Sequence, residues 1–155
     1  MRLFHGSNMS ISEIDLSKSM PNKDFGRAFY LSDTYEQAFQ MASLKSSLRG
    51  GTPIVTEFEY SQDESLKILQ FDSYTEEWAN FIFLYRDAIG EYHHGYDIVY
   101  GPIANDRIGL QIINLKDNYI DLKEFLRRIK YFKGITFQYA FCTPKSVQYL
   151  KPLCP

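Results

Sequence analysis

Apolar and polar residues alternate most regularly from Ile54 to Tyr60, the pattern of a half-buried β-strand. Shorter segments rich in apolar, β-branched and aromatic residues have the length and composition of further strands. These segments are residues 2–5, 28–31, 66–71, 96–100 and 137–142. Gly6-Ser7-Asn8 is expected to end the first of them, and Gly101-Pro102 to close the 96–100 segment.

Helical spacing of apolar residues appears between the predicted strands. The stripe Tyr35, Ala38, Phe39 and Ala42 predicts a helix from about 33 to 48, ended by Gly50-Gly51. The capping pair Asp33 and Glu36 is expected to open it, and the pair Ser73 and Glu76 to open a second helix that reaches about Ala88. The stripe of this second helix is Trp78, Phe81, Ile82 and Tyr85.

Other segments have weaker signals. Residues 8–24 are expected to form an ordered loop with one helical turn, and 106–115 are ambiguous. A helix with a basic face is predicted at about 120–130. Thr143-Pro144 predicts the N-cap and first residue of a short final helix that ends at Leu150.

The strands and helices follow one another without regular alternation, and the chain contains no repeat, linker or low-complexity block. This order favours an α+β domain over a doubly wound parallel sheet. A chain of 155 residues is long enough for one domain with its own core. We therefore predict a single domain over residues 1–155.

Composition narrows the function classes. The hydrophobic fraction of 45% excludes a disordered chain, and the net charge of −2 argues against a standing electrostatic footprint for nucleic acid. A local basic cluster remains, either as a solvated helix face or as a contact for phosphate or a nucleic-acid backbone. Its members are Lys123, Arg127, Arg128, Lys130 and Lys133.

The cysteines and the absence of apolar segments bear on location. Cys142 and Cys154 form neither a zinc spacing nor a disulfide framework, so we expect reduced thiols in a cytoplasmic protein. The N-terminus has no signal-peptide core, and no apolar run approaches the ~18 residues of a membrane span. A membrane partner is therefore not expected.

Two aromatic side chains stand where a ligand site is expected. His5 ends a predicted strand and precedes Gly6, so its ring is a candidate partner for a ligand hydroxyl, or else an ordinary histidine before a turn. Tyr30 ends the strand before the first helix, either as a stacking platform for a planar ring or as a core residue.

Two further pairs of neighbouring residues are weaker candidates for a functional site. His93-His94 resembles half a metal site, but no third ligand has suitable spacing, so a solvated loop and no metal are predicted. Asp106-Arg107 is either a salt-bridged turn or a pair facing the site. The sequence contains no glycine-rich phosphate loop, serine nucleophile elbow or HExxH motif.

Three segments in this order carry a resemblance to known proteins: FHGS at 4–7, FGRAFYLS at 25–32 and QYAFCT at 138–143. Together with DIVYGPIANDR at 97–107, they resemble an uncharacterised bacterial domain family related to ADP-ribosyltransferases. The His-Gly-Ser start and the Gly-x-x-x-Tyr strand also resemble the poly(ADP-ribose) polymerase and diphtheria-toxin branch of that superfamily.

The resemblance implies split mixed β-sheets flanked by helices, with NAD+ as co-substrate in a cleft between two small sheets. His5 would bond the hydroxyls of the adenosine-side ribose. The Gly6 backbone would hold the nicotinamide carboxamide with help from Ser7. Tyr30, on the strand that Gly26 opens, would stack on the nicotinamide ring, and the third catalytic position falls on Gln138.

The chain departs from this pattern at three places. Gln138 stands where active transferases commonly have glutamate; it accepts a hydrogen bond but cannot act as a base. Met41 lies near the position of a second tyrosine, and Ala28 replaces a glycine. Activity is then expected to be slow, restricted to nucleophiles that need no deprotonation, or absent.

Three functional hypotheses follow from the sequence. The first is a toxin-like or regulatory mono-ADP-ribosyltransferase that modifies a protein or nucleic-acid acceptor, with room for an antitoxin-like partner. The second is a non-catalytic module that binds NAD+, ADP-ribose or a partner protein. The third is a nucleic-acid-directed enzyme that uses the basic face from Lys123 to Lys133.

Overall fold

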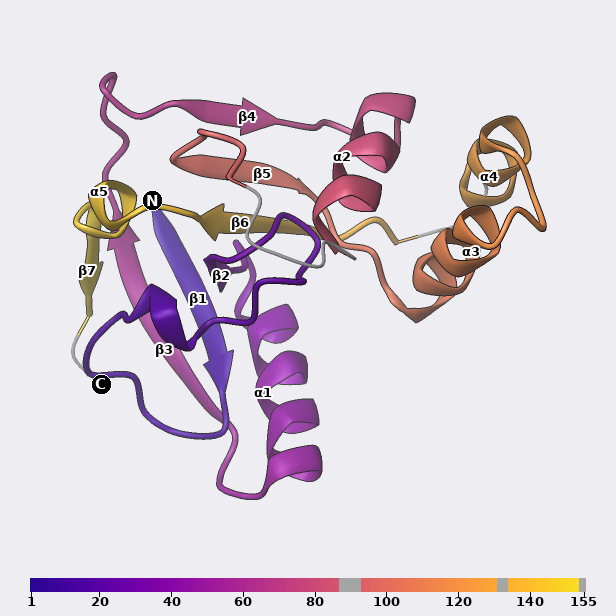
Figure 1. Cartoon of the computed structure of the whole chain (residues 1–155). Helices are drawn as coiled ribbons and strands as arrows, with labels where there is room; N and C mark the ends of the chain where they lie inside the picture. The colour runs from indigo at the N-terminus through magenta and orange to yellow at the C-terminus, as the bar shows by residue number, and fades with distance from the viewer. Residues whose placement is uncertain (87–92, 131–133, 154–155) are drawn as a thin grey trace.

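The computed structural model describes residues 1–86, 93–130 and 134–153, which form a single-domain α+β fold with two small sheets (Figure 1). The three-stranded sheet is antiparallel, in the order β1-β3-β7. Its strands are β1 (Arg2–Ser7), β3 (Ile54–Tyr60) and β7 (Leu150–Pro152). The predicted fold class is confirmed at this level.

The four-stranded sheet has the order β2-β6-β5-β4. Its strands are β2 (Phe29–Leu31), β6 (Phe137–Phe141), β5 (Ile98–Pro102) and β4 (Ile68–Gln70). The β4–β5 pair is parallel, whereas β6 is antiparallel to both of its neighbours. β6 therefore lies inside the sheet although it is the last of the four strands in the sequence.

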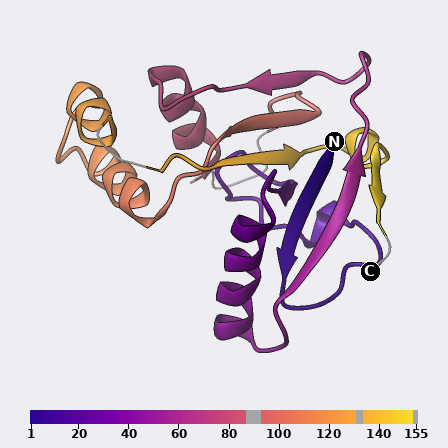
Figure 2. The same ribbon diagram turned by 180° about the vertical axis from the view of Figure 1, so that it is seen from behind.

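The helices lie around the two sheets. α1 runs along β1 and β3, whereas α3 and α4 pair with each other and extend beyond α2 (Figures 1 and 2). Their bounds are α1 (Tyr35–Arg49), α2 (Glu76–Arg86), α3 (Asp106–Lys116), α4 (Leu122–Ile129) and α5 (Pro144–Val147), with a 3₁₀ turn at Leu16–Lys18. Among the described residues, no helix combines the length and apolar character that a bilayer crossing requires.

The two sheets meet at an isolated pair of residues, Phe4 in β1 and Ser32 just after β2. Each backbone N–H donates to the carbonyl of the other residue at 2.8 Å. Beyond this pair the strands separate, since β1 continues along α1 and the chain after Ser32 turns into that helix. The seam therefore places His5 beside the end of β2.

Two apolar cores support this seam. One lies between the four-stranded sheet and α2, α3 and α4, and contains Phe25, Trp78, Val99, Phe125 and Ala140. The other joins the two sheets and contains Leu3, Leu31, Phe58, Ile98 and Phe141. Alternate side chains of β2 and β6 enter different cores, so both strands are anchored on both faces.

Several predicted strand boundaries are wrong because glycines were interpreted as breaks. β1 continues through Gly6 and Ser7, and β5 includes Gly101 and Pro102. A Cβ at Gly101 would lie 3.1 Å from the side chains of Phe25 and Phe71, so this glycine provides space. β7 was not predicted at all, since the segment was assigned to the end of the final helix.

The helix ends confirm some capping predictions and correct others. Thr143 forms the expected cap, in which its hydroxyl accepts from the Ser146 N–H. The Asp33–Glu36 box is wrong, because α1 begins at Tyr35 after the N-cap Thr34. At α2, the oxygen that accepts the Trp78 N–H belongs to Thr75 instead of Ser73.

The structure assigns two of the remaining segments, 106–115 and 120–130, to helices. The ambiguous 106–115 segment is α3, capped by the Asn105 side chain. α4 has the predicted basic face, on which Arg127 and Arg128 bond to Glu124. Three predictions concern residues that the structure does not describe: the end of the second helix at Ala88, the basic residue Lys133, and the thiol of Cys154.

Candidate functional site

His5 crosses the seam between the two sheets. Its Nδ1 lies 2.7 Å from the carbonyl oxygen of Tyr30, and its ring stacks on Phe29 with centroids 4.3 Å apart. Both partners belong to β2, so the imidazole is fixed by the neighbouring sheet. The alternative of an ordinary histidine before a turn is wrong, because β1 continues for two residues beyond His5.

The environment of His5 determines its protonation. Burial and, to a smaller extent, the positive charge of Lys45 together lower the pKa of His5 to about 4, against the opposing effect of the bond to Tyr30. The ring is therefore neutral at pH 7. Because a carbonyl only accepts, Nδ1 carries the proton, and Nε2 keeps a lone pair that accepts from a hydroxyl.

Gly6 lies in close contact with α1. A Cβ at this position would stand 1.9 Å from the Ala38 carbonyl oxygen and 2.9 Å from the Ala42 nitrogen. Peptide groups alternate direction along an antiparallel strand. Those of Phe4 point away from β3 toward Ser32, so the peptide groups of Gly6 also point away from β3.

Lys45, on the inner side of α1, already occupies one of these Gly6 groups. Its Nζ donates to the Gly6 carbonyl at 2.6 Å. Burial first, and then the positive charges of Lys23 and Arg49, lower the pKa of Lys45 to about 8. Because a carbonyl oxygen has two lone pairs, a ligand that donates to the Gly6 carbonyl would share this oxygen with Lys45 or displace it.

Ser7 ends β1 on the same side as His5, because the side chains of a strand alternate. It is buried and pairs with Ile54 of β3. The sequence assigned Ser7 an assisting contact beside Gly6. The structure places the Ser7 side chain on the opposite side of β1 from α1. Gly6 faces the helix, and the next side chain along the strand points the other way.

Tyr30 is held rigidly by the loop that precedes it. Its hydroxyl donates to the Gly26 carbonyl at 2.7 Å and accepts from the Phe25 N–H at 3.0 Å. Gly26 has a φ of 81°, which favours glycine. Burial raises the pKa of Tyr30 well above its ordinary value, so the hydroxyl stays protonated and serves the protein, while the half-buried ring is the part left for a ligand.

Gln138 shares a sheet face with Tyr30. Tyr30 pairs with Ala140 across β2 and β6, and Gln138 lies two residues before Ala140, on the same face. The Gln138 Nε2 donates to Asp24 Oδ2 at 3.0 Å. Asp24 belongs to the same loop as Phe25 and Gly26, so Tyr30 and Gln138 are anchored to one segment.

The three predicted catalytic residues thus converge on β2 by different routes. Gln138 and Tyr30 share a face, whereas His5 contacts the Tyr30 backbone and the Phe29 ring. The side chain of Phe29 projects from the opposite face of β2. The structure therefore brings His5 to the strand of Tyr30 and not onto the Tyr30 ring.

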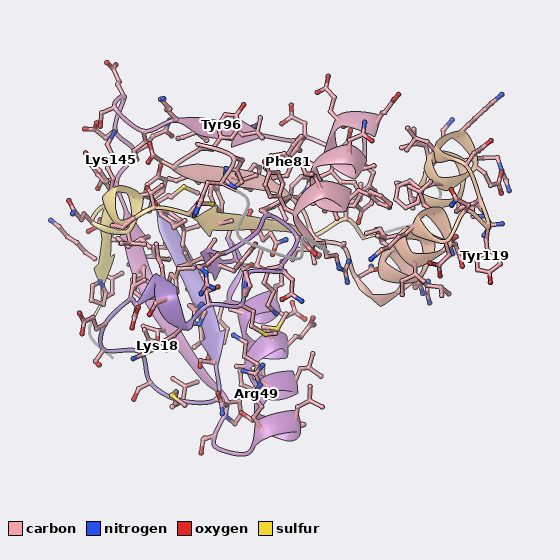
Figure 3. The ribbon with its side chains drawn as sticks, in the orientation of Figure 1. Lys18, Arg49, Phe81, Tyr96, Tyr119 and Lys145 are labelled. Carbon is pink, nitrogen blue, oxygen red and sulfur yellow. The ribbon has the colours of Figure 1, made fainter. Side chains whose placement is uncertain are left out.

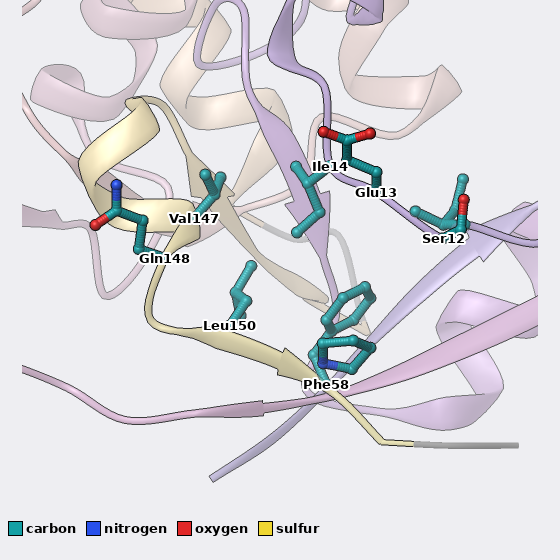
Figure 4. A pocket seen from close by; sticks show the side chains of 9 residues that line it. Ser12, Glu13, Ile14, Phe58, Val147, Gln148 and Leu150 are labelled. Atoms are coloured by element: carbon teal, nitrogen blue, oxygen red, sulfur yellow. The ribbon is translucent and has the colours of Figure 1, made fainter.

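An apolar hollow lies nearby on the three-stranded sheet (Figure 4). Its volume is about 220 Å³, and its lining includes Ile14, Phe58, Val147 and Leu150. The Phe29 ring contacts both His5 and Phe58, so it stands between this hollow and the imidazole. The hollow is a neighbour of the candidate site and not its centre.

The two other histidines, His93 and His94, lie in the segment before β5. His93 is exposed as predicted, but His94 is not in a solvated loop. Its ring packs against Phe81 and Tyr96, which are labelled in Figure 3, and its Nε2 lies 3.2 Å from the Phe25 carbonyl oxygen. Within the described ranges, no three His, Cys, Asp or Glu side chains gather as metal ligands.

Sequence reasoning missed Asp24 and Lys45. Lys45 carried a signal, because it lies three residues after Ala42 and seven after Ala38, on the face of the predicted helix expected to be buried. A lysine on such a face needs an internal acceptor. Asp24 carried no comparable signal, because its partner Gln138 is 114 residues away.

Comparison with known proteins identifies the family. Neither a curated protein nor a solved structure matches the chain. A family model described as a protein of unknown function, DUF3990, matches residues 1–151, and the chain therefore belongs to this family.

Proposed function

We propose that the protein binds NAD+ at the seam between its two sheets and transfers ADP-ribose to a macromolecular acceptor, as a mono-ADP-ribosyltransferase. The observation that carries this proposal is the neutral His5, fixed against the strand of Tyr30 with Nε2 free of the proton. This is the state that a histidine needs to accept a hydrogen bond from a ribose hydroxyl. The ADP-ribosyltransferase-like character of the fold is part of the same proposal.

The roles of the other residues follow from their surroundings. The Tyr30 ring offers a planar surface that needs no hydroxyl, since its own is bonded within the protein. The Gly6 peptide groups point away from β3 and suit a carboxamide, which both donates and accepts. The carboxamide would share the Gly6 carbonyl with the Lys45 ammonium or displace it.

The chemical step places specific demands on Gln138. The bond between the nicotinamide nitrogen and ribose C1′ breaks with its electron pair on nicotinamide. A lone pair of the acceptor then forms the new bond to C1′ and its proton leaves to solvent. The ribose gains oxocarbenium charge, which an acceptor on the 2′-hydroxyl stabilises. Gln138 supplies that acceptor but takes no proton.

Titration calorimetry with NAD+ tests the binding step. We expect the unsubstituted protein to bind NAD+, and His5→Ala and Tyr30→Ala each to weaken binding by at least about 10-fold, the effect of one lost hydrogen bond or stacking surface. The controls are His93→Ala and Tyr119→Ala. Both side chains are exposed, and Tyr119 lies on the outer side of the α3–α4 pair (Figure 3).

Incubation with NAD+ labelled in the adenylate portion tests transfer. Label should appear on acceptor macromolecules and should fall with His5→Ala but not with His93→Ala. An unsubstituted folded protein that binds no NAD+ would refute the proposal.

A non-catalytic NAD+-binding module is the second candidate, and the uncharged Gln138 favours it. This alternative predicts the same calorimetry without release of nicotinamide or transfer of label. The two candidates are therefore separated by measuring nicotinamide release at saturating NAD+.

A further inference from the structure

Asp24 is a mostly buried carboxylate beside the third predicted catalytic residue. Its side chain is 14% exposed. Oδ2 accepts from the Gln138 Nε2 at 3.0 Å and from the Ala104 N–H at 3.1 Å, and Oδ1 lies 3.6 Å from an Arg86 guanidinium nitrogen. Every one of these partners is a donor, which is the surrounding that an ionised carboxylate requires.

This arrangement fixes the orientation of the Gln138 amide. A backbone N–H only donates, so the bond from Ala104 makes Oδ2 an acceptor, and Gln138 must turn its NH₂ group toward Asp24. The Gln138 carbonyl oxygen is then the end of the amide left for a ligand. A negative charge on the far side of the amide also polarises it and increases the electron density on that oxygen.

We infer that Asp24 is a positioning residue that orients and polarises Gln138, so that the amide oxygen accepts from the ribose hydroxyl in place of a glutamate. This inference rests on the proposed function. It explains how a glutamine serves a position that demands negative charge: the charge is supplied by a different segment of the chain and reaches the ligand through one hydrogen bond.

The contact between Asp24 and Gln138 also predicts the effect of Gln138→Glu, which introduces the glutamate common in active transferases. Gln138→Glu places two carboxylates at the 3.0 Å separation now bridged by a hydrogen bond. Two like charges at such a distance share a proton, and one pKa rises strongly. Gln138→Glu alone should therefore lose stability as pH rises through that pKa, whereas Asp24→Asn/Gln138→Glu keeps one carboxylate and should be free of this loss.

The central experiment compares Asp24→Asn with Asp72→Asn. Asp72 also accepts from a glutamine, Gln70 Nε2, but at an exposed position outside the site. We expect Asp24→Asn to weaken NAD+ binding by roughly 10-fold, the difference between a charge-assisted and a neutral hydrogen bond. Asp72→Asn should leave it unchanged. If nicotinamide release is measurable, Asp24→Asn should lower kcat.

The pH profile gives a readout that a purely structural role would not change. Burial raises the pKa of Asp24 against the opposing effect of its donors, so NAD+ affinity should increase with pH as Asp24 ionises. Asp24→Asn should remove this part of the pH dependence and leave the part that comes from deprotonation of His5. The charged and titratable groups around Asp24 are Arg86, Lys23, Tyr30 and Tyr74. Burial raises the pKa of Tyr30 and of Tyr74, so neither hydroxyl ionises at mildly acidic or neutral pH.

The outcomes separate the two ideas. A protein that binds no NAD+ overturns the proposed function and this inference with it. NAD+ binding that Asp24→Asn leaves unchanged overturns the inference alone. Should Asp24→Asn not fold, urea unfolding of Gln138→Glu decides. Destabilisation relative to the unsubstituted protein that grows with pH supports the contact between residues 24 and 138, and the same pH dependence in both proteins refutes it.

Discussion

The imidazole of His5 should make the protein sensitive to acid. Burial lowers the pKa of His5 from 6.5 to about 4, while the unfolded chain titrates near the ordinary value. Between these values the unfolded state binds more protons, so stability is lost as pH falls through this window. At about 1.4 kcal/mol per pH unit of pKa difference, His5 should remove about 3 kcal/mol by pH 4.

Urea unfolding of the native protein and His5→Gln, followed by circular dichroism at several pH values, measures this contribution. Glutamine retains a donor for the Tyr30 carbonyl but does not titrate. The difference in unfolding free energy between the two proteins should therefore shift by about 3 kcal/mol between neutral pH and pH 4. His94, whose pKa is also lowered, is present in both proteins and cancels.

The result that would refute this reasoning is a difference that stays constant with pH. A His5 pKa near or above 6, measured by NMR from the ring proton shifts, would contradict it equally.

Three further substitutions test separate contacts. Gly6→Ala should destabilise the fold by at least about 2 kcal/mol in urea unfolding, because its Cβ would meet the Ala38 carbonyl; a neutral effect would show that α1 is not packed against β1. Tyr30→Phe should lower the free energy of unfolding by about 1–3 kcal/mol, because the Phe25 N–H and the Gly26 carbonyl lose their hydrogen-bond partner. NAD+ affinity should be unchanged, and a loss of affinity without a loss of stability would contradict the assigned roles. Thr143→Ala should lower stability by about 1–2 kcal/mol through loss of the cap on Ser146, with Thr143→Ser as the control that retains the hydroxyl, and equal unfolding midpoints would count against the cap.

The sequence predicted the elements whose pattern is local. Burial of one face produces both the alternation in residues 54–60 and the apolar stripe around Trp78 and Ile82. Both elements form as expected. β7 has three residues and no room for a pattern. It exists because β3 offers it a partner edge, which no local rule contains.

The errors at Gly6 and Gly101 have a common physical origin. A glycine in a sequence signals backbone freedom, and both residues were therefore placed at strand ends. In the fold, each glycine provides space, one for the Ala38 carbonyl and the other for Phe25 and Phe71. Only the tertiary arrangement distinguishes these two uses of glycine.

The candidate site shows the same difference between what the sequence indicates and what only tertiary contacts determine. His5, Tyr30 and Gln138 were singled out through the resemblance to ADP-ribosyltransferases, and the structure brings all three to β2 or its neighbouring strand. The contacts that tune them were not predictable, because Lys45 lies 39 residues from Gly6 and Asp24 lies 114 residues from Gln138. The resemblance proposes the residues, whereas their protonation and orientation depend on distant neighbours.

The central position of β6 has a consequence for synthesis of the protein. A chain emerges from the ribosome N-terminus first, and β2 gains its pairing partner only after residues 137–141 have been made. Until then Tyr30 has no completed sheet and Asp24 has no Gln138. The nascent chain therefore carries an unfinished site through most of translation, and any activity of that site begins only after the strand that closes the sheet has been released.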